Sequence, residues 1–114
     1  MSKSLEHHII ACARELISDP KHWTTGPKAK NHRGRRVTPD DPKATKFCAY
    51  GAILKTVYEL GLQSIDEENK LLERCADSIP PCGGLEGFTR LIHTNEHAGH
   101  SEVLALLDQT LHSM

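Results

Sequence analysis

The chain has 114 residues, of which 38% are hydrophobic and 25% are charged, and its formal net charge is −1. This composition excludes a disordered chain, no apolar run approaches the roughly 18 residues of a membrane span, and the first residues lack a signal-peptide stretch. We therefore expect one cytoplasmic domain over residues 1–114, without membrane contact and with its four cysteines as free thiols.

A first helix is expected to begin after Ser4, whose side chain can cap it. Apolar residues then recur at helical spacing. The pair Asp19-Pro20 should end the helix, because proline disfavours the helical conformation in the residue before it. The apolar stripe consists of Leu5, Ile9, Cys12, Ala13, Leu16 and Ile17.

The next segment is expected to be an irregular basic loop. Residues 20–40 contain three prolines, two glycines and the only tryptophan, and a short β-hairpin with Gly34 at positive φ is one option within them. Residues 21–46 hold eight Lys or Arg and two Asp, a local charge of +6, which leaves −7 for the rest. Trp23 is most simply a core anchor for this loop.

The charge of this loop suggests a surface for an anionic partner, and a solvated hairpin is the alternative. Basic side chains could contact nucleic-acid phosphates, with Trp23 available for stacking. No recognised nucleic-acid motif accompanies them, so nucleic acid is the less favoured partner. The residues concerned are Lys28, Lys30, Arg33, Arg35 and Arg36.

Asp41-Pro42 predicts the start of a central helix, since aspartate caps helices and proline fits the first turn. The helix should cover residues 42–60 and stop at Gly61. Its apolar residues surround most of its circumference, so it should be the most buried helix. Gly51 inside it costs about 1 kcal/mol relative to alanine, and close approach of another backbone is the expected reason.

Two or three further helices are expected. Ser64 and Glu67 form a predicted capping box, and the prolines and glycines of residues 80–84 break the chain. A short helix, a polar loop and a final helix should follow, at residues 85–92, at residues 95–100 and after Ser101 as the cap. The predicted fold is therefore mainly α: a compact bundle of four to five helices, with the basic loop between helices 1 and 2.

Cys48 is a candidate nucleophile if the central helix begins near Ala44, because a helix N-terminus or an imidazole lowers the pKa of a thiol. A histidine would then act as the base, by the chemistry of cysteine–histidine hydrolases. His93, His97 and His100 could each be this base, and His97 is our candidate. The alternative is that Cys48 packs as a small buried hydrophobe.

A metal site is considered and not predicted. His93 and His97 would share a face of a continuous helix, and Cys75 and Cys82 could complete four ligands. The spacing Cys-x6-Cys-x10-His-x3-His does not match the usual zinc patterns. We therefore expect neither a metal nor another cofactor.

Several special residues occur in an order that can be compared with known families. They are Trp23-Thr24 with Gly26, Gly34 with Val37, Asp41-Pro42 with Ala44, Cys48 with Gly51-Ala52, and Asn95 before Val103-Leu104-x-x-Leu107-Asp108. In this order the chain resembles a family of small bacterial and phage proteins known only as domain of unknown function number 6197. Phe47 replaces a common tryptophan of that family, and Glu96 replaces an aspartate. The resemblance implies no established activity.

The resemblance makes Trp23, Cys48 and Asn95, with Glu96 beside it, the candidates for a shared ligand or partner site. The same residues could instead serve the fold. The leading functional interpretation is a non-enzymatic binding or regulatory module that contacts a protein or a small ligand. The alternatives are an enzyme that uses Cys48 with a histidine and a weak electrostatic nucleic-acid binder that uses the loop over residues 28–36.

Overall fold

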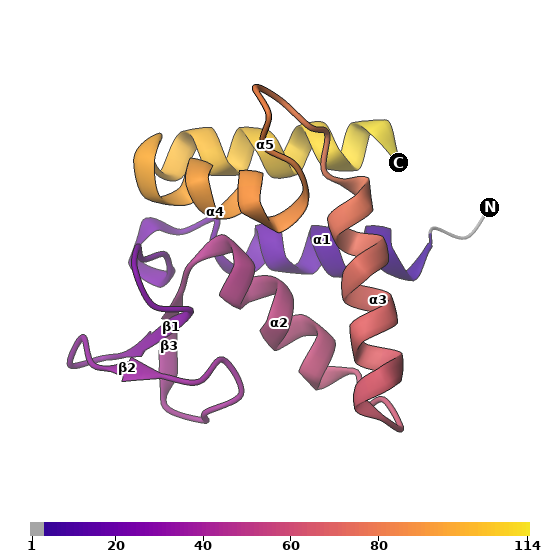
Figure 1. The fold of residues 1–114 in the computed structure, drawn as a ribbon. Helices are drawn as coiled ribbons and strands as arrows, with labels where there is room; N and C mark the ends of the chain where they lie inside the picture. Colours follow the sequence, from indigo (N-terminus) through magenta and orange to yellow (C-terminus); the bar gives the residue numbers. More distant parts are fainter. Residues whose placement is uncertain (1–3) are drawn as a thin grey trace.

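The computed structural model describes residues 4–114, which form five α-helices, one short 3₁₀ helix and a three-stranded antiparallel sheet (Figure 1). The predicted mainly α fold is confirmed. In chain order the elements are α1 (Leu5–Leu16), η1 (Pro20–His22), β1 (Ala29–Asn31), β2 (Arg36–Val37), β3 (Ala44–Phe47), α2 (Ala49–Glu59), α3 (Ile65–Ser78), α4 (Gly87–His97) and α5 (His100–Ser113).

The helices enclose one core, and the sheet projects from it beside the start of α2, away from α3 (Figure 1). Helix α1 contacts α2, α3 and α5, and α2 contacts α1, α3 and α4. Seven of the eleven residues of α2 are buried, as expected for the central helix. The largest fully buried side chains include Ile9, Ile10, Ile17, Ile53, Leu71, Leu91 and Leu107.

The sheet has the strand order β2-β1-β3, and β1 and β2 form the hairpin that was an option for this loop. The Asn31 side chain closes the turn, because its Oδ1 accepts the N–H groups of Arg33 and Arg35 at 3.0 Å each. Gly34 has a φ of +78° in this turn, which favours glycine over residues with a side chain.

The prediction of a helix from Pro42 is wrong. Asp41 caps only a single turn: its Oδ1 accepts the Lys43 N–H at 2.8 Å, and its carbonyl accepts the Ala44 N–H at 3.0 Å. The chain then extends as β3, where Phe47 pairs with Ala29 of β1 and is buried. Pairing with a strand some 15 residues earlier overrides the local helix signal, and α2 begins only at Ala49.

The expected close approach at Gly51 is confirmed. A Cβ atom at this position would lie 1.9 Å from the carbonyl oxygen of Lys28. That carbonyl accepts the Cys48 N–H at 3.2 Å, so the segment before β1 is bonded directly to the start of α2. Glycine is therefore the residue that lets the two backbones meet.

The predicted cap at Ser64 is confirmed, since its Oγ accepts the Glu67 N–H at 3.2 Å. The reciprocal bond goes to Gln63, whose N–H donates to Glu67 Oε2 at 3.1 Å. The prediction of a polar loop over residues 95–100 is wrong. Helix α4 continues to His97, and α5 begins at His100 after Gly99 with a φ of +101°.

Ser101 consequently lies inside the first turn of α5 and is not its cap. The polar side chain that made residue 95 look like a loop residue is buried in tertiary hydrogen bonds instead. Over residues 4–114, no helix combines the length and the apolar character needed to cross a membrane.

Candidate functional site

Asn95 is the most connected polar residue among the sequence candidates. It lies in α4 with 1% of its surface exposed. Its Oδ1 accepts the Trp23 indole N–H at 2.8 Å and the Ala49 backbone N–H at 2.9 Å. Its Nδ2 donates to the Thr24 carbonyl at 3.2 Å and to Glu96 Oε2 at 2.8 Å. We call these four bonds the Asn95 clasp. Because they use both lone pairs and both N–H groups, the amide is fully satisfied by the protein itself.

Glu96 extends the clasp by one bond. Its Oε1 accepts the Gly26 N–H at 2.6 Å, while its Oε2 accepts from Asn95. Helix α4 thus holds the segment before β1 at Trp23, Thr24 and Gly26. The family-like pattern Trp-Thr-x-Gly is the set of positions that α4 binds.

Trp23 is an anchor, as its simplest interpretation predicts. Its ring packs against the His100 ring with 5.1 Å between the centroids. The Nε2 of His100 lies 2.6 Å from the Ile17 carbonyl oxygen at the end of α1. Trp23 therefore connects the segment after α1 to both α4 and α5.

Cys48 is the N-cap of α2, and its Sγ accepts the Gly51 N–H at 3.2 Å. The side chain is buried, with 6% of its surface exposed. Burial raises the pKa of the Cys48 thiol, and the Glu96 carboxylate raises it further, although hydrogen bonds from backbone N–H groups at the helix end oppose this. The thiol is thus kept protonated, in contrast to the activated nucleophile considered from sequence.

The structure does not connect Cys48 to the histidines. Within residues 4–114, no imidazole hydrogen-bonds to the Cys48 thiol. His97 instead packs against His93, with 4.6 Å between the ring centroids. No group of three or more metal-ligating side chains occurs in this part of the chain.

Cys48, Asn95 and Glu96 meet at one small cavity of about 180 Å³. Ligand pockets are usually about 300–1,000 Å³, so this cavity is smaller than a usual small-molecule site. Trp23 reaches the same place only through its bond to Asn95. The residues that carry the family resemblance therefore converge, and their contacts serve to join segments of the fold.

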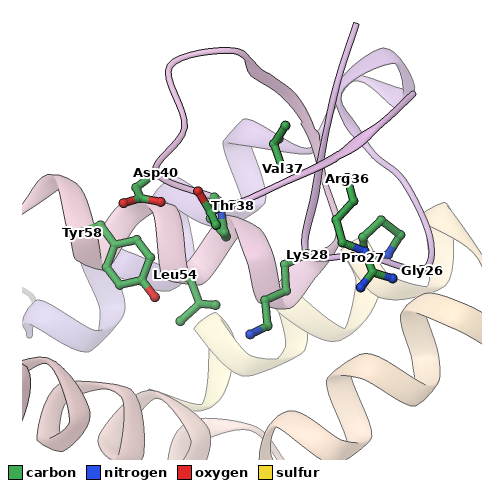
Figure 2. Close-up of a pocket in the computed structure, with 10 residues that line it drawn as sticks. Gly26, Pro27, Lys28, Arg36, Val37, Thr38, Asp40, Leu54 and Tyr58 are labelled. Atoms are coloured by element: carbon green, nitrogen blue, oxygen red, sulfur yellow. The ribbon is translucent and has the colours of Figure 1, made fainter. Parts of the chain in front are cut away.

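A larger cavity of about 700 Å³ lies between the loop after β2 and helix α2 (Figure 2). We call it the α2 groove. Figure 2 shows the Lys28 amine and the Tyr58 hydroxyl on either side of Leu54. Arg36 and Asp40 contribute one charge of each sign. The remaining lining residues are Gly26, Pro27, Val37, Thr38 and Pro39.

The outer face of the sheet carries a row of cations. Lys30 of β1 is in register with Arg36 of β2 and with Lys46 of β3. Residues directly opposite each other project from the same face of a sheet. The neighbouring register positions hold Ala29, Val37 and Phe47, of which Ala29 and Phe47 are buried. Arg36, Lys30 and Lys46, here named the cationic row, therefore lie on the face of the sheet opposite to Ala29 and Phe47, and Arg36 at one end of the row also lines the α2 groove.

These cations have no carboxylate partner. The ion pairs within residues 4–114 are Arg14–Asp108, Lys55–Glu59 and Arg74–Glu6, and none of them involves residues 21–46. The five basic residues predicted as one surface are distributed over three places: Lys28 and Arg36 line the α2 groove, Lys30 lies in β1, and Arg33 and Arg35 lie at the exposed hairpin turn.

Sequence reasoning missed Tyr58, Leu54, Asp40 and Lys46. No pattern in the sequence identifies Lys46 as a strand residue, because residues 44–47, Ala-Thr-Lys-Phe, do not alternate between apolar and polar side chains. The groove residues could not be grouped from sequence, because the loop and α2 meet only in the folded chain.

Comparison with known proteins gives one match. The sequence model of a family described as a family of unknown function matches residues 1–112. No curated protein and no solved structure matches the chain.

Proposed function

Because the chain belongs to the DUF6197 family, which is a family of unknown function, we propose a function from its own residues: a non-enzymatic module that binds a small anionic ligand in the α2 groove. Its volume of about 700 Å³ lies within the usual range for small-molecule sites. The proposal keeps the small-ligand interpretation of the sequence and moves its site from Asn95 to the groove.

The observation that carries the proposal is a pair of cations, Lys28 and Arg36, at a cavity with an apolar wall, neither of which has a carboxylate partner among the described residues 4–114. Lys28 stands between this groove and the cavity of about 180 Å³, which it also lines, and its Nζ lies 5.7 Å from the centroid of the Tyr50 ring in that smaller cavity. Cations aimed at a cavity stabilise a carboxylate or phosphate by charge-assisted hydrogen bonds. Leu54 and Val37 would contact an apolar ligand body, and Asp40 would accept a hydrogen bond from a hydroxyl or amine at its other end.

A ligand screen tests this proposal. The protein is titrated with a panel of aromatic and aliphatic carboxylates and phosphate monoesters, while amide resonances and thermal unfolding are followed. A ligand present at about 100 times its Kd stabilises the native state by about 2.7 kcal/mol, which raises Tm by about 10 °C. We expect the largest resonance shifts at residues 26–28, 36–40 and 54–58.

Two double variants give the control. Lys28→Gln with Arg36→Gln should abolish the stabilisation, whereas Arg33→Gln with Arg35→Gln removes the same charge at the hairpin turn and should leave it intact. Equal losses in both variants would show that only overall charge matters. A panel without any ligand that shifts the groove resonances would overturn the proposal.

Electrostatic binding of nucleic acid is a second candidate, which the cationic row favours. Like charges directly opposite each other in a sheet are destabilising, so a polyanion laid across Arg36, Lys30 and Lys46 would relieve their repulsion. The sheet has no recognition helix to read base edges, so such binding would be independent of base sequence.

Variants separate the two candidates. Lys30→Gln with Lys46→Gln should reduce retention on two unrelated DNA sequences at low salt and flatten its salt dependence, but should leave binding of a small anion intact. Retention that is unchanged in this variant, or that strongly favours one DNA sequence at physiological salt, would exclude the nucleic-acid candidate.

A further inference from the structure

A thiol–imidazole pair lies on the other side of α2, away from the α2 groove. Cys12 Sγ is 3.5 Å from Nε2 of His8 and 3.8 Å from its Nδ1, one helical turn earlier in α1. Since the sulfur is at nearly equal distances from both ring nitrogens, it lies over the face of the ring, and rotation of the ring about its Cβ–Cγ bond would turn the unprotonated nitrogen of either neutral tautomer toward the thiol. Neither residue was connected to a function by the sequence analysis.

The pair opens into a cavity of about 470 Å³ between α1 and α2, which is large enough for a small organic group. Cys12 is partly exposed, so a reagent can reach its sulfur. The other charged groups that line the cavity are Glu15 of α1 and Lys55 and Glu59 of α2. Lys55 is paired with Glu59 at 2.5 Å, and among residues 4–114 the Glu15 carboxylate has no ion-pair partner.

We propose that this cavity is a thiol-exchange site, in which Cys12 forms a mixed disulfide with a low-molecular-weight disulfide that carries an amine. The imidazole supplies the proton acceptor that a cysteine nucleophile needs, and the cavity supplies room for the group that stays attached. The Glu15 carboxylate favours a cationic group in this position.

The exchange is balanced without any other reactant. The Cys12 Sγ–H proton passes to the His8 ring as the sulfur attacks one sulfur atom of the disulfide R–S–S–R. The Cys12–S–S–R bond forms and the R–S–S–R bond breaks. The departing thiolate takes the proton from His8 and leaves as R–SH, so the reagent is reduced while the Cys12 thiol is oxidised to the mixed disulfide.

The four cysteines provide an internal comparison. Cys82 is exposed, whereas Cys48 and Cys75 are buried. If accessibility alone decided the reaction, Cys82 would react before the half-buried Cys12. The native protein is therefore treated with cystamine, a cationic disulfide, and with dithiodipropionate, an anionic one, and each cysteine is followed by peptide mass spectrometry.

We expect cystamine to modify Cys12 before Cys82, and faster than dithiodipropionate does. His8→Gln should slow the modification of Cys12 by about a hundredfold or more, which is the lower end of the usual range for loss of a general base, and should leave the rate at Cys82 unchanged. Glu15→Gln should reduce the ratio between the rates at which cystamine and dithiodipropionate modify Cys12. Both variants are altered at exposed positions of α1, and circular dichroism should show that they remain folded.

The proposal is overturned if Cys82 reacts first and His8→Gln leaves the Cys12 rate unchanged. It is also overturned if cystamine shows no advantage over dithiodipropionate at Cys12. The α2 groove shares no lining residue with this cavity. Either result therefore leaves the proposed ligand-binding function unaffected. Likewise, a ligand screen without binding in the α2 groove would not contradict the proposed thiol exchange.

Discussion

Asn95 shows how one side chain can hold three parts of a fold. An amide is the only uncharged side-chain group with two strong acceptor sites and two donors in one plane. At this position the acceptor serves an indole and a helix N-terminus, and the donors serve a carbonyl and a carboxylate. Aspartate would lose both donors and would place a second carboxylate beside Glu96.

We predict that Asn95→Ala lowers the free energy of unfolding by about 2–5 kcal/mol, because it leaves the Trp23 and Ala49 N–H groups buried without acceptors. Urea unfolding followed by circular dichroism measures the change. Asn69→Ala, at an exposed position of α3, is the control and should change stability by less than about 0.5 kcal/mol. Similar losses in both variants would contradict a structural role for the clasp.

At the scale of elements, the start of α2 is determined by its contacts with other segments of the chain. Its first residues are bonded to the segment before β1 and to α4, and Gly51 is the point of closest approach. Alanine is a better helix former than glycine by about 1 kcal/mol, so intrinsic propensity alone would make Gly51→Ala stabilising. The position of the Lys28 carbonyl reverses that expectation.

We predict that Gly51→Ala lowers the free energy of unfolding by at least about 1–3 kcal/mol, the usual cost of overpacking. The reason is that the alanine Cβ would lie 1.9 Å from a backbone oxygen. Unfolding in urea again provides the measurement. Ala105→Gly, at an exposed position of α5, reports the propensity difference without packing and should cost about 1 kcal/mol. A Gly51→Ala protein more stable than wild type would show that α2 and the segment before β1 do not pack as described.

The elements that the sequence predicted well are those with local determinants. Ser4 and Ser64 cap α1 and α3 through bonds to residues three positions later, and Gly34 meets a requirement of its own turn. The start of α2 and the end of α4 depend on partners elsewhere in the chain. Pairing with β1 made Ala44–Phe47 a strand, and the buried clasp kept Asn95 helical, so local patterns at these two places were misleading.

At the scale of the whole molecule, the candidate site was predicted in composition and not in arrangement. The excess of positive charge over residues 21–46 was visible in the sequence. The positive charge is distributed among the α2 groove, the cationic row and the hairpin turn. This distribution depends on the strand register and on the packing of residues 36–40 over α2. These are long-range contacts, and no spacing within the loop encodes them.

Buried thiol and phenol groups also make the free energy of unfolding fall at alkaline pH. Burial raises the pKa of Cys75 to about 12 and raises the pKa of Cys48, Tyr50 and Tyr58 as well. Each group holds its proton more tightly in the native state. The contribution of Cys75 is therefore fully present below about pH 9, and it is lost as the pH rises from about 9 to about 12.

We predict that the free energy of unfolding of the wild type falls more steeply from pH 8.5 to pH 11 than that of Cys75→Ala, because the variant lacks this thiol. Urea titrations at several pH values compare the two slopes. Cys82→Ala, which removes an exposed thiol, should retain the wild-type slope. Parallel curves for wild type and Cys75→Ala would contradict the prediction.

The position of Trp23 also gives the molecule an optical probe of its own. It is the only tryptophan of the chain, so the long-wavelength emission of the native protein comes from one indole. That indole lies where α4 and α5 meet the segment after α1, bonded to Asn95 and packed against His100. Release of this junction would expose the indole to water and move its emission to the red, even while α1, α2 and α3 kept their ellipticity. Fluorescence and circular dichroism therefore observe different parts of this protein, and a lag between the two signals would time the opening of the junction separately from loss of the helices.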